Sequence, residues 1–145
     1  MSDAMEGTTD PMPPLPGPTL FDRLGGYNAI AATADDLTDR LYVNATLNAN
    51  PAIGAFHDKH EKAGFKYMLT AWVVANTGGP KQVYAGRPMD EAHAHLTITS
   101  REFDIVMTEC RTTFYKFNVP EQELEELMGI LESYRTQIVH RAPVN

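Results

Sequence analysis

The sequence predicts an all-α fold, and three observations lead to this prediction. Beyond residue 19, apolar residues recur at intervals of three and four, which is the spacing of one buried helical face. Glycine, proline and asparagine separate these periodic stretches. No stretch shows a convincing strand-like alternation of apolar and polar residues. With 145 residues, of which 43% are apolar and 21% charged, the chain suffices for one globular domain.

The first 18 residues differ from the rest of the chain. They contain five of the ten prolines and show no hydrophobic period. They also lack the basic start and apolar stretch of a signal peptide. We therefore interpret residues 1–18 as a disordered, proline-rich arm and residues 19–145 as the folded domain.

Charge and cysteine content exclude several classes of partner and site. The formal net charge of −7 offers no basic surplus for binding a nucleic acid or an anionic membrane. No apolar run approaches the roughly 20 residues that a membrane-spanning helix needs. The single cysteine, Cys110, excludes an intrachain disulfide and a cysteine-based zinc site, so we expect a reducing, cytoplasmic setting.

The first half of the domain is predicted to hold three helices. A short helix fits residues 20–24 and ends at a glycine pair. A second helix begins near Asn28, a suitable N-cap. Its buried face is predicted to comprise Ile30, Ala34, Leu37 and Leu41. The asparagine-rich stretch 44–51 ends in proline and is predicted to be a loop. A third helix spans about residues 60–75 and is predicted to bury Phe65, Met68, Leu69, Trp72 and Val73.

The second half is predicted to hold three more helices. Pro88 suits the first position of a short helix, with Asp90 and Glu91 near its positive dipole end. Thr99 and Glu102 form a capping box for the next helix. The buried face of that helix is predicted to comprise Phe103, Val106, Met107, Cys110, Phe114 and Phe117. The last helix opens at Pro120 and is predicted to bury Leu124, Leu127, Leu131, Tyr134 and Ile138.

Two neighbouring histidines are predicted to face opposite ways. Met89, His93 and Leu96 are spaced i, i+4, i+7, so His93 is predicted to point to the buried side of its helix. His95 lies roughly 200° further around the helix axis and is predicted to face solvent. The two therefore cannot bind one ion together. On these grounds alone, a buried histidine is more often a core residue than a ligand.

The other reactive side chains are predicted to be structural. His57 and His60, spaced i, i+3, could share a metal on a helix, but we interpret them as exposed residues at a helix start. Cys110 lies on an apolar face and is interpreted as core packing rather than as a nucleophile. The sequence has no P-loop, no HExxH, no GxSxG and no GxGxxG within a strand–helix unit.

The order of the predicted helices and of the glycine-rich turns between them resembles that of the group I truncated hemoglobins, from residue 19 to about residue 139. This family is a shortened globin, with two helices over two helices around a haem. Two glycine pairs match, Gly25-Gly26 after the first helix and Gly78-Gly79 after the third. The most specific match is the segment from Gly78 to Leu96, which contains the following motif residues: Tyr84, Gly86, Arg87, Met89, Glu91, Ala92 and His93.

The resemblance implies that His93 is the proximal ligand of the haem iron. Its other ring nitrogen would donate to a nearby backbone carbonyl. Phe56 falls where the family has a phenylalanine stacked on the haem, and Phe103 and Val106 would line the proximal side. The residues placed at the cofactor are Phe56, Phe65, Met68, Leu69, Trp72, Tyr84, Arg87, Met89, His93, Phe103 and Val106.

The distal side departs from the family pattern. Members usually carry a tyrosine on the second helix that donates a hydrogen bond to bound dioxygen. Counting from the first glycine pair places Thr38 there, and Tyr42, one turn later, is the alternative. Phe65, Met68 and Leu69 take the positions of the distal helix that face the ligand. Such an apolar pocket predicts weaker retention of dioxygen than in the usual member, with carbon monoxide less affected.

The sequence also predicts how the haem is held. The family's occasional covalent link, from a histidine of the last helix to a vinyl group, has no match because His140 lies beyond that position. There is no CxxCH attachment motif either. We therefore predict heme b, iron protoporphyrin IX, held by His93 and apolar burial. Arg87 or Lys81 could pair with the propionates, although plain surface charges are the more common case.

The resemblance implies a globin that reversibly binds dioxygen, nitric oxide and carbon monoxide. Oxygen transport and nitric oxide detoxification, the latter a dioxygenase activity that would require a reductase, both stay open. We expect a monomer or a weak dimer. The alternative function is a haem-free helical interaction module with a degenerate globin fold, whose apolar stripe packs against itself or a partner.

Overall fold

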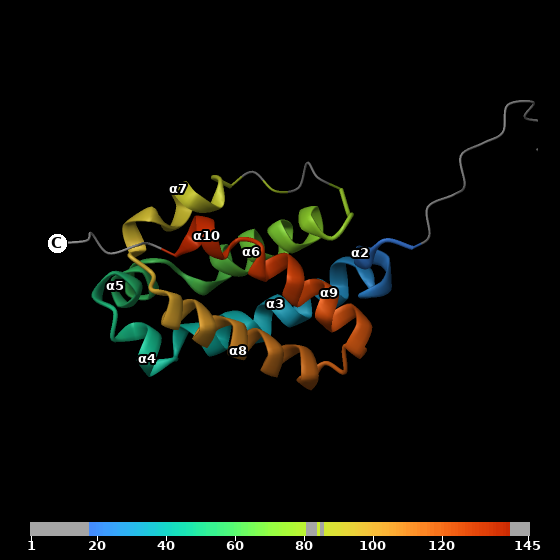
Figure 1. Ribbon diagram of the computed structural model, residues 1–145, viewed down its shortest axis with the longest axis horizontal. Coiled ribbons are helices and arrows are strands. Elements are labelled where there is room, and N and C mark those ends of the chain that lie inside the picture. The colour runs from blue at the N-terminus through green and yellow to red at the C-terminus, as the bar shows by residue number, and fades with distance from the viewer. Residues whose placement is uncertain (1–17, 81–83, 85, 140–145) are drawn as a thin grey trace, which may run out of the picture.

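The computed structural model describes residues 18–80, 84 and 86–139, and within these ranges it contains helices and no strand (Figure 1). The all-α prediction is thereby confirmed. The predicted arm lies outside the described residues, apart from Pro18. The elements are α2 (Leu20–Arg23), α3 (Gly26–Tyr42), α4 (Ala45–Asn48), α5 (Pro51–Lys59), α6 (Lys62–Asn76), α7 (Met89–His93), the 3₁₀ turn η2 (Ala94–Leu96), α8 (Ser100–Lys116), α9 (Glu121–Glu132) and α10 (Arg135–Ile138).

The long helices pack as two connected pairs. α3 packs most extensively on α6, α8 packs on α9, and α3 also contacts α8. Short elements complete the fold: α4 and α5 lie at one end of the molecule, α2 and α9 meet near the other, and α7 lies beside α10 (Figure 1). Within the described ranges, no helix combines the length and the apolar character needed to span a lipid bilayer.

The turn between α2 and α3 depends on two glycines. Gly25 and Gly26 have φ values of +105° and +78°, which other L residues rarely adopt. A Cβ atom on Gly25 would also lie 2.8 Å from the Cβ of Ala29. Because the second glycine already belongs to the helix, α3 starts two residues before the predicted N-cap Asn28, and Gly25 takes the N-cap position instead.

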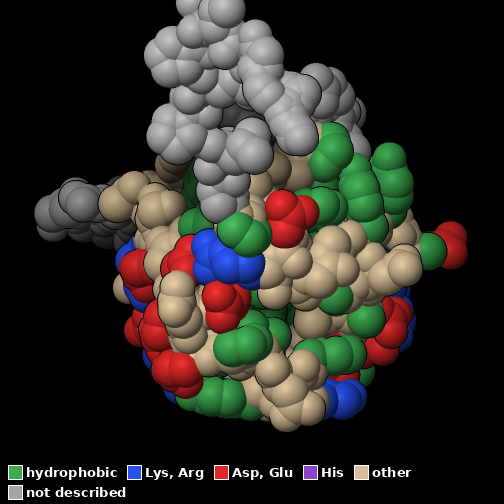
Figure 2. Space-filling view, turned by 90° about the vertical axis from the view of Figure 1, so that its right-hand side faces the viewer, with side chains coloured by type: hydrophobic (Ala, Val, Ile, Leu, Met, Phe, Trp, Pro, Cys, Tyr) green, Lys and Arg blue, Asp and Glu red, His purple; other side chains and the backbone are tan. Residues whose placement is uncertain are grey.

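The short helix α2 is fixed at both ends. Thr19 and Asp22 form a capping box at its start. Its last residue, Arg23, pairs with Glu123 at 2.8 Å and with Glu126 at 2.7 Å, both on α9. The molecular surface at this end carries basic and acidic side chains next to one another, among apolar ones (Figure 2).

The prediction of a loop over residues 44–51 is wrong, because this stretch contains the starts of α4 and α5. Asn44 accepts a hydrogen bond from the backbone N–H of Leu47 at 3.0 Å and caps α4. Asn50 accepts from the N–H of Ala52 at 3.0 Å and caps α5, which has Pro51 in its first turn. Asparagine and proline, which indicated a loop, are also the residues that start helices.

The C-terminal half follows the prediction except at two places. The capping box of α8 is present, with Thr99 and Glu102 bonded reciprocally. The predicted last helix is interrupted after Glu132, where the Ser133 hydroxyl donates to the carbonyl of Ile130 at 2.6 Å and so competes with the helical backbone bonds. Phe117 was predicted to be buried, but it follows the end of α8 and is 39% exposed.

Cys110 is a core residue, as predicted. Its side chain is 2% exposed, and burial raises the pKa of Cys110 to about 12. The thiol therefore stays protonated at neutral pH, when only a thiolate would act as a nucleophile.

One carboxylate links α3 to α8. Asp36 accepts hydrogen bonds from Arg40 Nε at 2.7 Å, Thr113 Oγ1 at 2.9 Å and Lys116 Nζ at 2.6 Å. Burial alone would raise the pKa of Asp36, but the bonds from Lys116, Arg40 and Thr113 outweigh burial and lower the pKa to about 2. Asp36 is thus ionised wherever the protein is folded under ordinary conditions.

Candidate functional site

His93 ends α7 and is half-buried. Its Nδ1 atom lies 2.8 Å from the backbone carbonyl oxygen of Met89. Because a carbonyl oxygen only accepts, Nδ1 carries the proton and Nε2 keeps its lone pair in the neutral ring. Burial lowers the pKa of His93 below its ordinary value, against the raising effect of the Met89 bond, so the ring is neutral near pH 7. This is the protonation state in which an imidazole binds a metal.

His95, two residues later in η2, is exposed. The predicted opposite placement of the two rings is therefore confirmed. Among the described residues, no three histidine, cysteine, aspartate or glutamate side chains come together to hold a metal ion. A haem iron needs no such cluster, because it takes one imidazole from a globin and its other ligands from the porphyrin.

An aromatic cluster joins α3, α5 and α6 and consists of Tyr42, Phe56, His57, His60 and Phe65. The His60 ring stacks on Phe56 at 4.1 Å between centroids, and the His57 ring stacks on Tyr42 at 4.2 Å. Phe65 lies edge-on to Tyr42 at 5.6 Å and to Phe56 at 6.1 Å. The prediction of exposed residues at a helix start is wrong for His57, which is half-buried near the end of α5, and is confirmed for His60, which is exposed and lies just before the N-cap of α6.

The two alternative distal donors differ in their hydrogen bonding. Tyr42 donates its hydroxyl to the backbone carbonyl of His60 at 3.1 Å. Thr38 is fully buried, at 0% exposure, and its Oγ1 atom has no hydrogen-bond partner among the described residues. The Thr38 hydroxyl is therefore a buried polar group whose hydrogen-bonding capacity the described residues leave unused.

The predicted distal residues of α6 have different neighbours. Leu69 is half-buried and packs against the hydrophobic core. Met68 lies against the segment before α7, because a Cβ on Gly86 would lie 2.5 Å from the Met68 Cε. Trp72 is buried and meets the ring of Tyr134 edge-on at 5.1 Å, so it contacts the stretch between α9 and α10.

The segment before α7 is anchored by Tyr84. The Tyr84 hydroxyl donates to the backbone carbonyl of Arg87 at 2.9 Å, while the Arg87 side chain is exposed. Met89 is half-buried at the start of α7 and supplies the carbonyl that orients His93. The other predicted propionate partner, Lys81, lies outside the described residues.

Phe103 and Val106 lie on α8, near the hydrophobic core. Phe103 is 6% exposed, and the guanidinium of Arg135 lies 4.5 Å from its ring centroid. Val106 is half-buried and packs on the core cluster. Both residues therefore present apolar side chains on α8.

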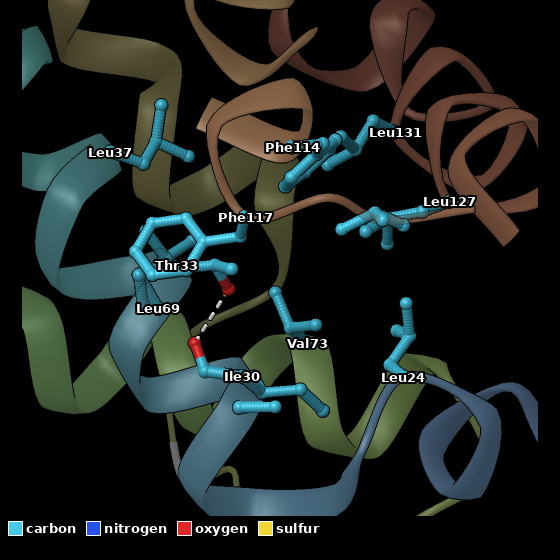
Figure 3. A pocket seen from close by; sticks show the side chains of 13 residues that line it. Leu24, Ile30, Thr33, Leu37, Leu69, Val73, Phe114, Phe117, Leu127 and Leu131 are labelled. Atoms are coloured by element: carbon cyan, nitrogen blue, oxygen red, sulfur yellow. Dashed lines mark hydrogen bonds between the residues drawn. The ribbon is translucent and has the colours of Figure 1, made fainter. Parts of the chain in front are cut away.

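An apolar cavity of about 120 Å³ lies between α3, α6, α8 and α9 (Figure 3). Leu69 and Val73 of α6 line it together with Leu37 of α3. The hydroxyl of Thr33 is a polar group of the lining, and it donates to the carbonyl of Ile30 at 2.8 Å. The cavity therefore presents hydrocarbon next to the predicted distal position Leu69.

Sequence reasoning missed the cavity and the aromatic cluster. The i, i+3 spacing of His57 and His60 suggested a joint role, but each ring stacks on a different partner. Phe117, predicted to be core, lines the cavity from the end of α8. No local signal in the sequence indicates these arrangements, because each depends on residues from three or more helices.

The donor set fits a haem. One neutral imidazole has a free Nε2, and the predicted neighbours of the cofactor on α6 and α8 are apolar. Thr38 adds a buried hydroxyl without a partner among the described residues. A porphyrin needs this combination of a single axial ligand and apolar walls.

Comparisons with known proteins agree with this chemistry. A family model for bacterial-like globins matches residues 19–140. The group 1 truncated hemoglobin of Nostoc commune is 34% identical over 88 residues, which cover 61% of this chain and 69% of the relative. The group 1 truncated hemoglobin of Tetrahymena thermophila is 26% identical over 127 residues, which cover 81% of this chain and 92% of the relative.

Solved structures show the same fold. The truncated hemoglobin from Tetrahymena pyriformis, in its Fe(III) form, superimposes with a TM-score of 0.72 at 21% identity, covering 85% of this chain and 99% of that one. The 2/2 hemoglobin from a Synechococcus species, in the cyanomet state with covalently attached heme, gives the same values. Since the family model spans most of the sequence, the chain belongs to the bacterial-like globin family and is a haem-binding, gas-binding truncated hemoglobin of group 1.

Proposed function

We propose that His93 is the axial ligand through which this globin holds heme b. The observation that carries the proposal is the bond between His93 Nδ1 and the Met89 carbonyl, which leaves Nε2 as the coordinating atom. Bound haem would supply an iron atom that can bind dioxygen, nitric oxide or carbon monoxide. The side chains proposed to surround it are Phe56, Phe65, Met68, Leu69, Trp72, Tyr84, Arg87, Met89, Phe103 and Val106.

Titration of the purified protein with hemin tests this function. We expect a Soret band that grows to one haem per chain and a pyridine hemochrome spectrum of heme b. A protein that stays colourless would contradict the proposal and favour the haem-free interaction module. Extraction with acidic butanone distinguishes the b-type from a covalent form, since a covalently linked haem would stay with the protein.

Noncovalent attachment is supported by the sequence of the last helices. The covalently attached heme of the Synechococcus protein is a property of that protein. In this chain α9 and α10 carry no histidine, and His140 lies outside the described residues. We therefore propose that burial and one coordinate bond hold the haem.

We predict that the reduced protein without added ligand has five-coordinate iron. Lys66 of α6 is paired with Asp35 and with Asp39, at 2.5 and 3.2 Å, and so is not free to coordinate iron. His60 stacks on Phe56, which leaves the Met68 sulfur as the coordinating atom among the predicted distal residues. Thioether coordination would require Met68 to leave its place against Gly86.

The visible spectrum of the dithionite-reduced protein checks this prediction. One broad band supports five-coordinate iron. Sharp, split bands would show an internal sixth ligand and contradict the placement of α6. Met68→Leu and His60→Ala variants would then show which side chain supplies that ligand.

The physiological role is a separate proposal. Reversible gas binding supports oxygen transport in the cytoplasm, and nitric oxide detoxification is the second candidate, which requires a reductase to return the iron to the ferrous state. We propose a monomer or a weak dimer for either role. Turnover of nitric oxide to nitrate with a reductant, followed over several cycles, distinguishes the two.

A further inference from the structure

We propose that Asn50 positions His93 for the haem iron, because it ties the chain that follows His93 to the start of α5. Asn50 would act through the backbone on the C-terminal side of His93 and not as a ligand, so it is a positioning residue. The inference rests on the proposed function, since it takes His93 as the axial ligand.

The side-chain amide of Asn50 has two ends with different partners. Its Oδ1 atom accepts from the backbone N–H groups of Ala52 at 3.0 Å and Ile53 at 3.4 Å, and so caps α5. Its Nδ2 group donates to the carbonyl of Leu96 at 3.1 Å and lies 3.4 Å from the carbonyl of Thr97. An N–H only donates and a carbonyl only accepts, so these partners fix which end of the amide is which. The cap of α5 is therefore also a bond to the end of η2.

The end of η2 is a strained turn that needs such a bond. Thr97 follows η2 with a φ of +51°, in the left-handed region that threonine rarely adopts. This turn lets Leu96 and Ile98 both pack into the core, each 8% exposed, while Thr97 is exposed. The Asn50 amide contacts the carbonyls of the two peptide groups that flank Thr97. It therefore holds the turn in a conformation that threonine alone does not favour.

The same amide joins three segments that are proposed to surround the haem. Its Nδ2 group also donates to Glu102 Oε1 at 3.1 Å, and Glu102 belongs to the capping box of α8. The three segments that meet at Asn50 carry Phe56 on α5, His93 on α7 with η2, and Phe103 on α8. Loss of the amide donor should therefore change the place of the His93 segment relative to its proposed neighbours.

The bond on the other side of His93 cannot fulfil this role. His93 Nδ1 lies 2.8 Å from the Met89 carbonyl, but both residues belong to α7, so this bond sets the ring and moves with the helix. Within the described ranges, the hydrogen bonds that reach residues 89–97 from another element come from Asn50. Asn50 therefore fixes this segment against another helix, as partners of a metal ligand often do.

The Asn50→Asp variant tests the inference. Aspartate keeps the acceptor that caps α5 but has no N–H to donate. We expect hemin transfer to an excess of a haem-scavenging protein to be about tenfold faster, the lower end of the effect of losing a group that orients a metal ligand. In the resonance Raman spectrum of the reduced, gas-free protein, the iron–histidine stretching band should shift and broaden, because His93 is no longer held in one place.

The Asn44→Asp variant is the matched control. Asn44 caps α4 by accepting from the Leu47 N–H at 3.0 Å, and it donates to Glu109 of α8 at 2.8 Å. The variant therefore also keeps a cap and loses an amide bond to a glutamate of α8, but away from η2. It should release hemin as the wild type does and leave the iron–histidine band unchanged. Equal effects of the two variants would overturn the inference.

The Asn50→Ser variant separates the lost donor from the added charge. Serine caps a helix without charge and is too short to cap α5 and also reach η2. It should therefore release hemin as fast as Asn50→Asp does. Release at the wild-type rate, or an unchanged iron–histidine band in both Asn50 variants, would overturn the inference. Absence of a Soret band in the wild type would instead contradict the proposed function.

Discussion

We expect the His93→Ala variant to lose haem, with an affinity for hemin that falls by more than about 100-fold. Replacing a residue that merely orients a metal ligand already costs up to about that factor, and His93 is the proposed ligand itself. The neutral ring and its bond to the Met89 carbonyl give His93 its coordinating Nε2, and no described cluster of side chains offers a substitute site. Hemin titration followed at the Soret band measures the loss.

The His95→Ala variant is the matched control, since His95 is two residues away and exposed. It should bind hemin as the wild type does. Free imidazole should restore a Soret band in His93→Ala, because it can occupy the space of the missing ring and supply the same nitrogen. Equal loss in the two variants would overturn the assignment of His93.

Substitution of Asp36 should have the largest effect on stability. Asp36→Asn removes the charge that Arg40 and Lys116 neutralise and weakens the bond from Thr113. Its folded pKa of about 2 lies below the ordinary value of 3.8. This difference corresponds to about 2 kcal/mol of unfolding free energy at pH 7. Urea unfolding of the wild type and the variant measures the loss.

The contribution of Asp36 has a defined pH dependence. The folded state binds fewer protons at Asp36 than the unfolded state does, so the stabilisation is complete above about pH 4 and decreases as the pH falls toward 2. The difference between wild type and Asp36→Asn should therefore shrink over this window. Asp39→Asn serves as control, because its ion pairs are exposed and contribute less. A pH-independent difference would rule out the charge as the cause.

Local sequence signals predicted the long helices well. Periodic apolar residues located α3, α6, α8 and α9 to within a few residues, and the capping box of Thr99 and Glu102 located the start of α8. The four-residue helix α4 was missed because one turn has no periodicity to detect. The interruption after Glu132 was missed because it accompanies the contact of Tyr134 with Trp72, which lies far away in sequence.

The site was predictable only where one helix determines it. The angle between residues on one helix sufficed to predict that His93 is more buried than His95. It could not show that the Tyr42 hydroxyl already has an acceptor, because that acceptor is the carbonyl of His60, 18 residues later. Whether the buried Thr38 hydroxyl has a hydrogen-bond partner depends on every helix packed around it. No residue spacing in the sequence therefore predicts that it has none among the described residues.

The attachment of α2 bears on how the molecule opens. A four-residue helix is not stable in isolation, yet α2 is held by the capping box, by the bond from the Phe21 N–H to the Thr77 carbonyl at 2.7 Å, and by Arg23 on α9. Fraying of α2 would break contacts to two other helices. Amide hydrogen exchange in α2 therefore reports cooperative opening of α6 and α9 rather than the local motion of a chain end.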